Sequence, residues 1–103
     1  MDREFISKRV SDIRYAHDMS ARNLSLELGM SSEYVNQLEM GRMSPSLDFL
    51  INFCEYFNIT LAEFFDESVE HITQTRKIAS ILNKMTEQEV NKLLDFLEEI
   101  TSN

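Results

Sequence analysis

The stretch from Ser20 to Pro45 constrains the fold more than any other part of the chain, because it contains both of the chain's glycines. Gly29 and Gly41 each follow a short amphipathic segment. Glycine readily adopts the left-handed conformation that the chain often needs just after a helix C-terminus. The spacing therefore predicts two short helices joined by a tight turn at Gly29, followed by an exit loop at Gly41.

Capping residues predict where the helices begin. Ser20 and Ser31 are favourable N-caps for these two helices, and Pro45 suits the first turn of the next one. Thr60 and Thr86 each precede a glutamate by three residues, which is the spacing of a capping box. The expected helices cover about 3–17, 20–28, 32–39, 45–57, 60–65, 78–85 and 86–100.

Apolar residues recur at three- and four-residue spacing, which predicts an all-α fold with one buried stripe per helix. The composition agrees, since 2 Gly and 1 Pro in 103 residues are too few for a sheet rich in tight turns. In the helix over 45–57 the inward positions are expected to be Leu47, Leu50, Ile51, Cys54 and Phe57.

The pattern divides the chain in two. Residues 1–66 are expected to form a five-helix domain, and residues 67–103 a helical extension, with a soft boundary at 66–70. No apolar run suits a transmembrane helix or a signal peptide, and the single cysteine, Cys54, fits a reducing cytoplasm. The expected location is therefore the cytoplasm, without membrane attachment.

Residues 6–65 resemble the Cro and phage-repressor (XRE) class of helix-turn-helix proteins. The resemblance is carried over this whole span by Ile13, Arg14, Leu24, Leu28, Gly29, Met30, Ser31, Val35, Leu38, Glu39, Gly41, Pro45, Leu50, Cys54, Phe57, Asn58, Ile59 and residues 61–64. It implies a DNA-binding transcriptional regulator, expected to be a repressor. Its third helix would lie in the major groove of an operator, and two copies would bind two half-sites.

The resemblance makes residues in and around the third helix candidates for DNA contact. Asn36 and Gln37 can pair bidentately with adenine, and Glu33 can accept a hydrogen bond from cytosine. Arg22 and Arg42 are candidates for phosphate contacts, and Lys8 and Arg9 would add charge if the first helix presents them. The full set of candidates is Ser20, Arg22, Ser31, Ser32, Glu33, Tyr34, Asn36, Gln37 and Arg42. Tyr34 could instead pack against the second helix.

Two positions depart from the family pattern, and one pair follows it. Ala21 stands where the family commonly has a glutamine that clamps a phosphate, so one backbone contact is expected to be missing. Ser25 replaces a small apolar residue and still lets the third helix approach. Arg14 and Glu39 match a structural ion pair of the family, and burial would make each charge depend on the other.

The net charge of −8 opposes DNA binding and leaves a second function open. In that alternative the chain is a protein-interaction module, such as an antitoxin or antirepressor, that keeps the fold without strong operator binding. Enzymatic activity is not expected, since no catalytic arrangement is visible, and neither a cofactor nor a metal site is indicated. Cys54 is interpreted as a small buried residue rather than a nucleophile.

The C-terminal segment has too many apolar residues to stay exposed. Its last helix carries a seam formed by Val90, Leu93, Leu94, Leu97 and Ile100. The seam predicts homodimerisation, which would also double the few phosphate contacts of one chain. The alternative is that residues 68–101 fold back onto the chain's own core.

Overall fold

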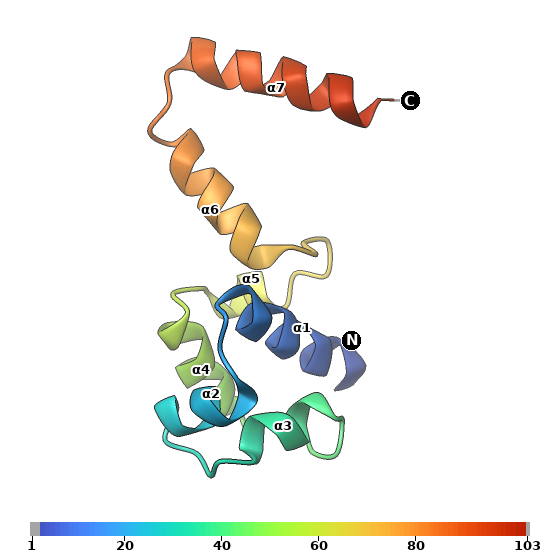
Figure 1. Cartoon of the computed structure of the whole chain (residues 1–103), viewed down its shortest axis with the longest axis vertical. Helices are drawn as coiled ribbons and strands as arrows, with labels where there is room; N and C mark the ends of the chain where they lie inside the picture. The colour runs from blue at the N-terminus through green and yellow to red at the C-terminus, as the bar shows by residue number, and fades with distance from the viewer. Residues whose placement is uncertain (1–2, 103) are drawn as a thin grey trace. The chain divides into compact units, whose positions relative to one another are not determined.

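The computed structural model describes residues 3–102. These residues form seven helices joined by turns and loops, and no strand is present among them. The all-α prediction is confirmed. Figure 1 shows the helices α1 (Arg3–Ala16), α2 (Ala21–Glu27), α3 (Tyr34–Glu39), α4 (Leu47–Tyr56), α5 (Leu61–Phe64), α6 (Ile72–Leu82) and α7 (Glu87–Thr101).

The chain divides into two units after Thr73, which is later than the expected boundary at 66–70. The difference arises because the first unit includes the start of α6. Ile72 is 4% exposed and Thr73 is 8% exposed, so both belong to the buried part of the first unit. The change to a polar pattern after Asp66 therefore marks a surface loop and not the end of the packed region.

The core of the first unit is built around the rings of α4 and α5. Phe53 and Phe64 are completely buried and meet edge to face, with ring centroids 5.7 Å apart. Leu47 was predicted to lie on the buried face of α4, but this prediction was wrong, because Leu47 is 65% exposed. The buried face is centred on Phe53 and includes Phe49, so Leu47 lies at its rim in the first helical turn.

Both glycines end their helices as predicted. Gly29 and Gly41 have φ values of +74° and +73°, in the left-handed region. The amide after each glycine closes back onto the helix: Met30 N donates to the Ser25 carbonyl (2.8 Å), and Arg42 N donates to the Gln37 carbonyl (3.1 Å). These bonds satisfy helix-end carbonyls that would otherwise lack partners.

The start of the third helix differs from the prediction. α3 begins at Tyr34 with Glu33 as its N-cap, not at residue 32 after Ser31, and no side chain caps it. Residues 32–33 instead form a turn in which the Tyr34 amide donates to the Ser31 carbonyl (3.1 Å). Ser31 thus contributes its backbone, and its hydroxyl stays exposed.

The second unit consists of most of α6 and all of α7. The capping box at Thr86 is present, with the Thr86 amide donating to Glu89 Oε1 (2.9 Å) and the Glu89 amide donating to Thr86 Oγ1 (3.2 Å). No side chain from 74 to 102 is buried. The second unit therefore has no core of its own comparable to that of the first.

Candidate nucleic-acid interface

The α2–α3 pair presents one side of α3 to solvent. Val35 and Leu38 are fully buried and fix the inner side of α3 against the core. Asn36 and Glu33 are exposed, and Gln37 is half-buried. Because residues three and four apart share a helix face, burial of Val35 and Leu38 leaves the polar side chains on the opposite face. The polar face of α3 is therefore open to a ligand.

Ser25 ties the start of α3 to α2. Its hydroxyl is completely buried, donates to the Ala21 carbonyl (2.8 Å) and accepts from the Val35 amide (3.0 Å). That amide is one of the helix-start donors that lack an intrahelical partner. Sequence reasoning recognised Ser25 as small enough for close packing and missed this bond. The absence of a side-chain cap on α3 explains why the bond is needed.

Replacing Ser25 with alanine is expected to lower the free energy of unfolding by about 1–3 kcal/mol, because the Val35 amide would remain buried without an acceptor. Urea unfolding would measure the change, and hydrogen exchange at the Val35 amide should become faster. Ser32→Ala is the matched control, since the half-buried Ser32 hydroxyl makes no hydrogen bond within residues 3–102. An unchanged unfolding midpoint in Ser25→Ala would contradict this role.

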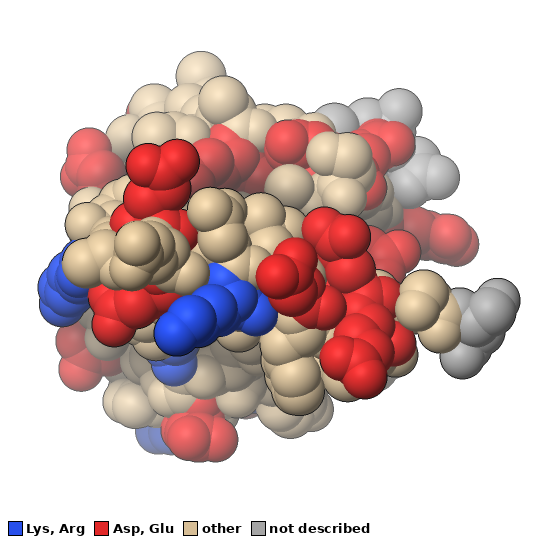
Figure 2. All heavy atoms as spheres, turned by 90° about the horizontal axis from the view of Figure 1, so that it is seen from above, with Lys and Arg blue, Asp and Glu red and all other residues tan. Residues whose placement is uncertain are grey.

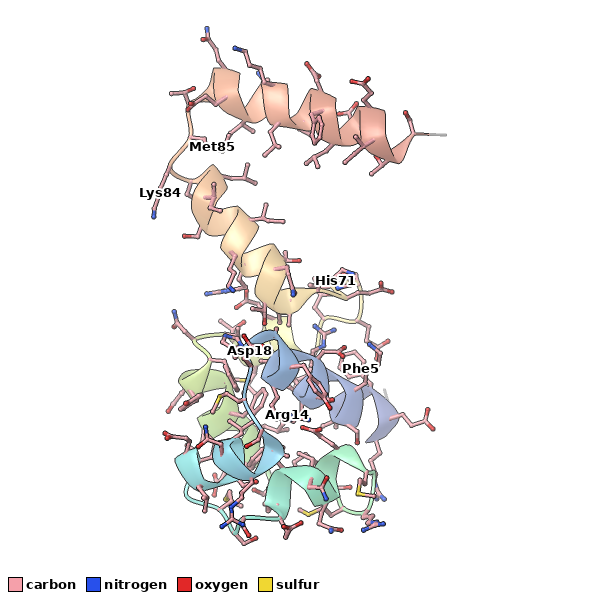
Figure 3. All side chains as sticks on the ribbon, in the orientation of Figure 1. Phe5, Arg14, Asp18, His71, Lys84 and Met85 are labelled. Carbon is pink, nitrogen blue, oxygen red and sulfur yellow. The ribbon has the colours of Figure 1, made fainter. Side chains whose placement is uncertain are left out.

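A bidentate ion pair links α1 to the end of α3. Arg14 Nε donates to Glu39 Oε2 (2.7 Å) and Nη2 donates to Oε1 (2.8 Å), while Nη1 donates to the Met19 carbonyl (2.7 Å). The side chains of Arg14 and Glu39 are only 8% and 12% exposed. Hydrogen bonding to Glu39 raises the pKa of Arg14 above its usual range. Figure 3 shows Arg14 below α1, on the side where α2 and α3 lie.

The other residues expected at the interface have different surroundings. Ser20 is occupied as the N-cap of α2, where its Oγ accepts from the Asn23 amide (3.0 Å). The Tyr34 ring packs on Phe49 of α4, with ring centroids 4.8 Å apart. Within residues 3–102, no hydrogen bond or ion pair engages the side chains of Arg22, Ser31, Ser32, Glu33, Asn36, Gln37 and Arg42.

Few basic side chains of the first unit are available to phosphates. Arg9 is 5% exposed, so the expectation that α1 could present it was wrong. Its Nη2 donates to the Asp66 carbonyl (2.9 Å), and its guanidinium carbon lies 4.9 Å from the centre of the Phe5 ring. Lys8 is exposed and pairs with Asp12 at 2.7 Å. Arg22 and Arg42 remain as exposed cations near the α2–α3 pair in sequence.

Acidic side chains dominate parts of the remaining surface. Figure 2, which views the molecule from above relative to Figure 1, shows more acidic than basic side chains on the visible face. Such a surface repels DNA phosphates.

Two observations bear on metal binding and on thiol chemistry among residues 3–102. No cluster of three or more His, Cys, Asp or Glu side chains could hold a metal ion there. Cys54 is 3% exposed, and burial raises the pKa of its thiol to about 11. The thiol is therefore protonated at neutral pH and unsuited to act as a nucleophile.

Comparison with known proteins agrees with this geometry. A family model described as helix-turn-helix matches residues 10–64, which include α2, the turn and α3. Neither the curated proteins nor the solved structures gave a significant match to the chain. No helix within residues 3–102 is long and apolar enough to cross a membrane.

Proposed function

The chain belongs to the Cro and phage-repressor (XRE) family of helix-turn-helix DNA-binding regulators, and we propose that it is a sequence-specific repressor that binds its operator as a homodimer. The observation that carries the proposal is the open polar face of α3, where Asn36 and Gln37 have no partner within residues 3–102. This face is held on a framework formed by the Arg14–Glu39 pair and the Ser25 hydroxyl. The cytoplasm is the proposed location.

The proposed contacts divide into base reading and positioning. Asn36 and Gln37 read adenines in the major groove, and Glu33 selects cytosine. Arg22 and Arg42 bind phosphates, and the Ser31 and Ser32 hydroxyls donate to the same backbone. The phosphate contacts set the orientation of α3 on the duplex and carry no sequence information themselves.

The small number of cations near α3 supports the proposed homodimer. Arg22 and Arg42, the two side chains proposed to bind phosphates, neutralise too few phosphates for tight binding by one chain, and a second copy doubles that number. The seam of Val90, Leu93, Leu94, Leu97 and Ile100 on α7 is the proposed contact between copies. Its exposed members include Leu94 (47%), Leu97 (41%) and Ile100 (58%). The matching half-sites would lie about one helical turn, or 34 Å, apart.

Substitutions should separate base reading from phosphate binding. Gln37→Ala is expected to weaken operator binding by about 1–3 kcal/mol per half-site, or about 2–6 kcal/mol for the dimer, and to leave non-specific binding unchanged. Arg42→Ala should weaken binding to both DNAs. In a dimer, Arg42→Ala also removes two phosphate contacts, so the slope of log K against log salt should become shallower by about 1.8. Fluorescence anisotropy on DNA from upstream of the chain's own gene, at several salt concentrations, measures both quantities.

Lys8→Ala is the matched control for Arg42→Ala, because it removes a cation that is paired with Asp12. The slope of log K against log salt for Lys8→Ala should equal that of the parent chain. Absence of any specific binding by the parent chain would refute the proposed function. That outcome, together with a protein partner that contacts α3, would favour the protein-interaction module, which the net charge of −8 also favours.

A further inference from the structure

The two helices of the second unit carry the same apolar pattern. Ile78, Ile81, Leu82 and Met85 have the spacing i, i+3, i+4, i+7, and Val90, Leu93, Leu94 and Leu97 repeat it. This spacing gives one continuous apolar stripe on a helix, although Met85 itself lies in the turn after α6 (Figure 3). Ile78 and Ile81 are 52% and 59% exposed, as open as the residues of the α7 seam. Leu82, Met85, Val90 and Leu93 are half-buried, so each stripe is covered in part and leaves apolar side chains exposed.

The segments that contain these two helices carry opposite charge. Residues 74–86 contain three basic side chains and no acidic one, namely Arg76, Lys77 and Lys84. α7 contains one basic side chain, Lys92, and five acidic ones, namely Glu87, Glu89, Asp95, Glu98 and Glu99. Packing α7 against another α7 would place two acidic helices side by side, whereas packing it against α6 joins opposite charges. Electrostatics thus favours α6 as the neighbour of α7.

In a hairpin closed within one chain, α6 would cover only part of the α7 stripe. α7 has 15 residues and α6 has 11, of which the first two are buried in the first unit. At 1.5 Å per residue, the end of α7 would extend roughly 6 Å or more beyond α6 in a closed hairpin. Ile100 would then stay uncovered. Stable interfaces use about 20–30 residues a side, and the stripes of α6 and α7 together present more apolar surface for such an interface than the α7 stripe alone.

We infer that α7 of one copy packs against α6 of a second copy, and reciprocally, so that the dimer is a four-helix assembly and not a seam between two α7 helices. The inference rests on the proposed homodimer and specifies which surfaces meet in it. Association should bury the Ile78 and Ile81 side chains of α6 as well as the α7 seam. Both helices then gain the tertiary packing that short helices require for stability.

Reversing the charge of one residue on α6 or of one residue on α7 tests this arrangement. Lys77→Glu and Glu98→Lys should each weaken the homodimer by roughly three- to tenfold at low salt, because each places like charges on facing helices. A mixture of the two variants should form heterodimers above the statistical share, since both α6–α7 contacts in the heterodimer are again complementary. Native mass spectrometry of the full-length chains measures these populations.

The parent chain mixed with Glu98→Lys is the control. In the inferred arrangement this mixture gives no preference for heterodimers, because one of the two contacts is repulsive. In an α7–α7 seam it does give a preference, and Lys77→Glu has no effect on association. That result would overturn the inference and leave the homodimer standing. A parent chain that is monomeric at tens of micromolar would overturn both the inference and the proposed homodimer.

An apolar substitution provides a second, independent measurement. Ile78→Asp should raise the dimer dissociation constant by on the order of tenfold or more, because it places a carboxylate in the buried part of the interface. Ser80→Asp adds the same charge outside the stripe of α6 and should leave association unchanged. Circular dichroism confirms that the first unit remains folded in both variants. Equal dissociation constants for the two variants would exclude α6 from the interface. Dimers that form as inferred but fail to bind DNA would refute the operator-binding proposal alone.

Discussion

Replacing Arg14 with alanine is expected to lower the free energy of unfolding by about 3–5 kcal/mol. The substitution leaves Glu39, 12% exposed, without its bidentate partner, and it also removes the donor to the Met19 carbonyl. The loss is large because a buried carboxylate that loses its counter-ion retains the full cost of leaving water. Urea or thermal unfolding of the full-length chain measures the change.

Two variants separate this effect from a general effect of removing charge. Lys8→Ala breaks an exposed pair and should cost less than about 1 kcal/mol. Arg14→Ala combined with Glu39→Gln should cost less than the sum of the two single substitutions, because the uncompensated carboxylate is then absent. If Arg14→Ala unfolded at the same midpoint as the parent, the pair would contribute no net stability.

The ends of α2 and α3 and the all-α class could be predicted from the sequence, because they depend on local chemistry, whereas the helix expected over 78–85 covers Ile72–Leu82. Gly29 and Gly41 end their helices by the same bonding pattern, and Thr86 forms the expected capping box. The start of a helix depends more on residues that are distant in the sequence. Ser31 has the right side chain for an N-cap, yet α3 starts at Tyr34 because Ser25, ten residues before Val35, supplies the acceptor that its amide needs.

Burial was the property that sequence spacing predicted least well. The spacing that placed Leu47 inward applies equally to Phe49 and Phe53, and the ring contacts among α4 and α5 decide between them. Arg9 illustrates the same limit, because a charged residue on α1 is expected in solvent unless its partner is known. That partner is the Asp66 carbonyl, 57 residues away in the sequence. The DNA-contact and dimer residues stay predictions, since they concern partners outside the chain.

Leu97→Asp is expected to lower operator affinity by about 10²–10⁴-fold without altering the surface of α3, because two linked half-site contacts become independent ones. Leu97 is 41% exposed in the single chain and lies in the proposed interface. An aspartate there would have to lose water without a partner on association, so the dimer should dissociate. Fluorescence anisotropy on a full operator measures the affinity, and analytical ultracentrifugation measures the dimer.

The same variant distinguishes lost association from lost DNA contact. On a duplex with one half-site, Leu97→Asp and the parent should bind with similar affinity, since each half-site engages a single α3. Asn91→Asp is the matched control, because it adds the same charge at an exposed position of α7 outside the seam. It should bind the full operator like the parent. If Leu97→Asp bound the full operator as tightly as Asn91→Asp, α7 would not carry the coupling between half-sites, and the source of DNA affinity would have to lie within the first unit.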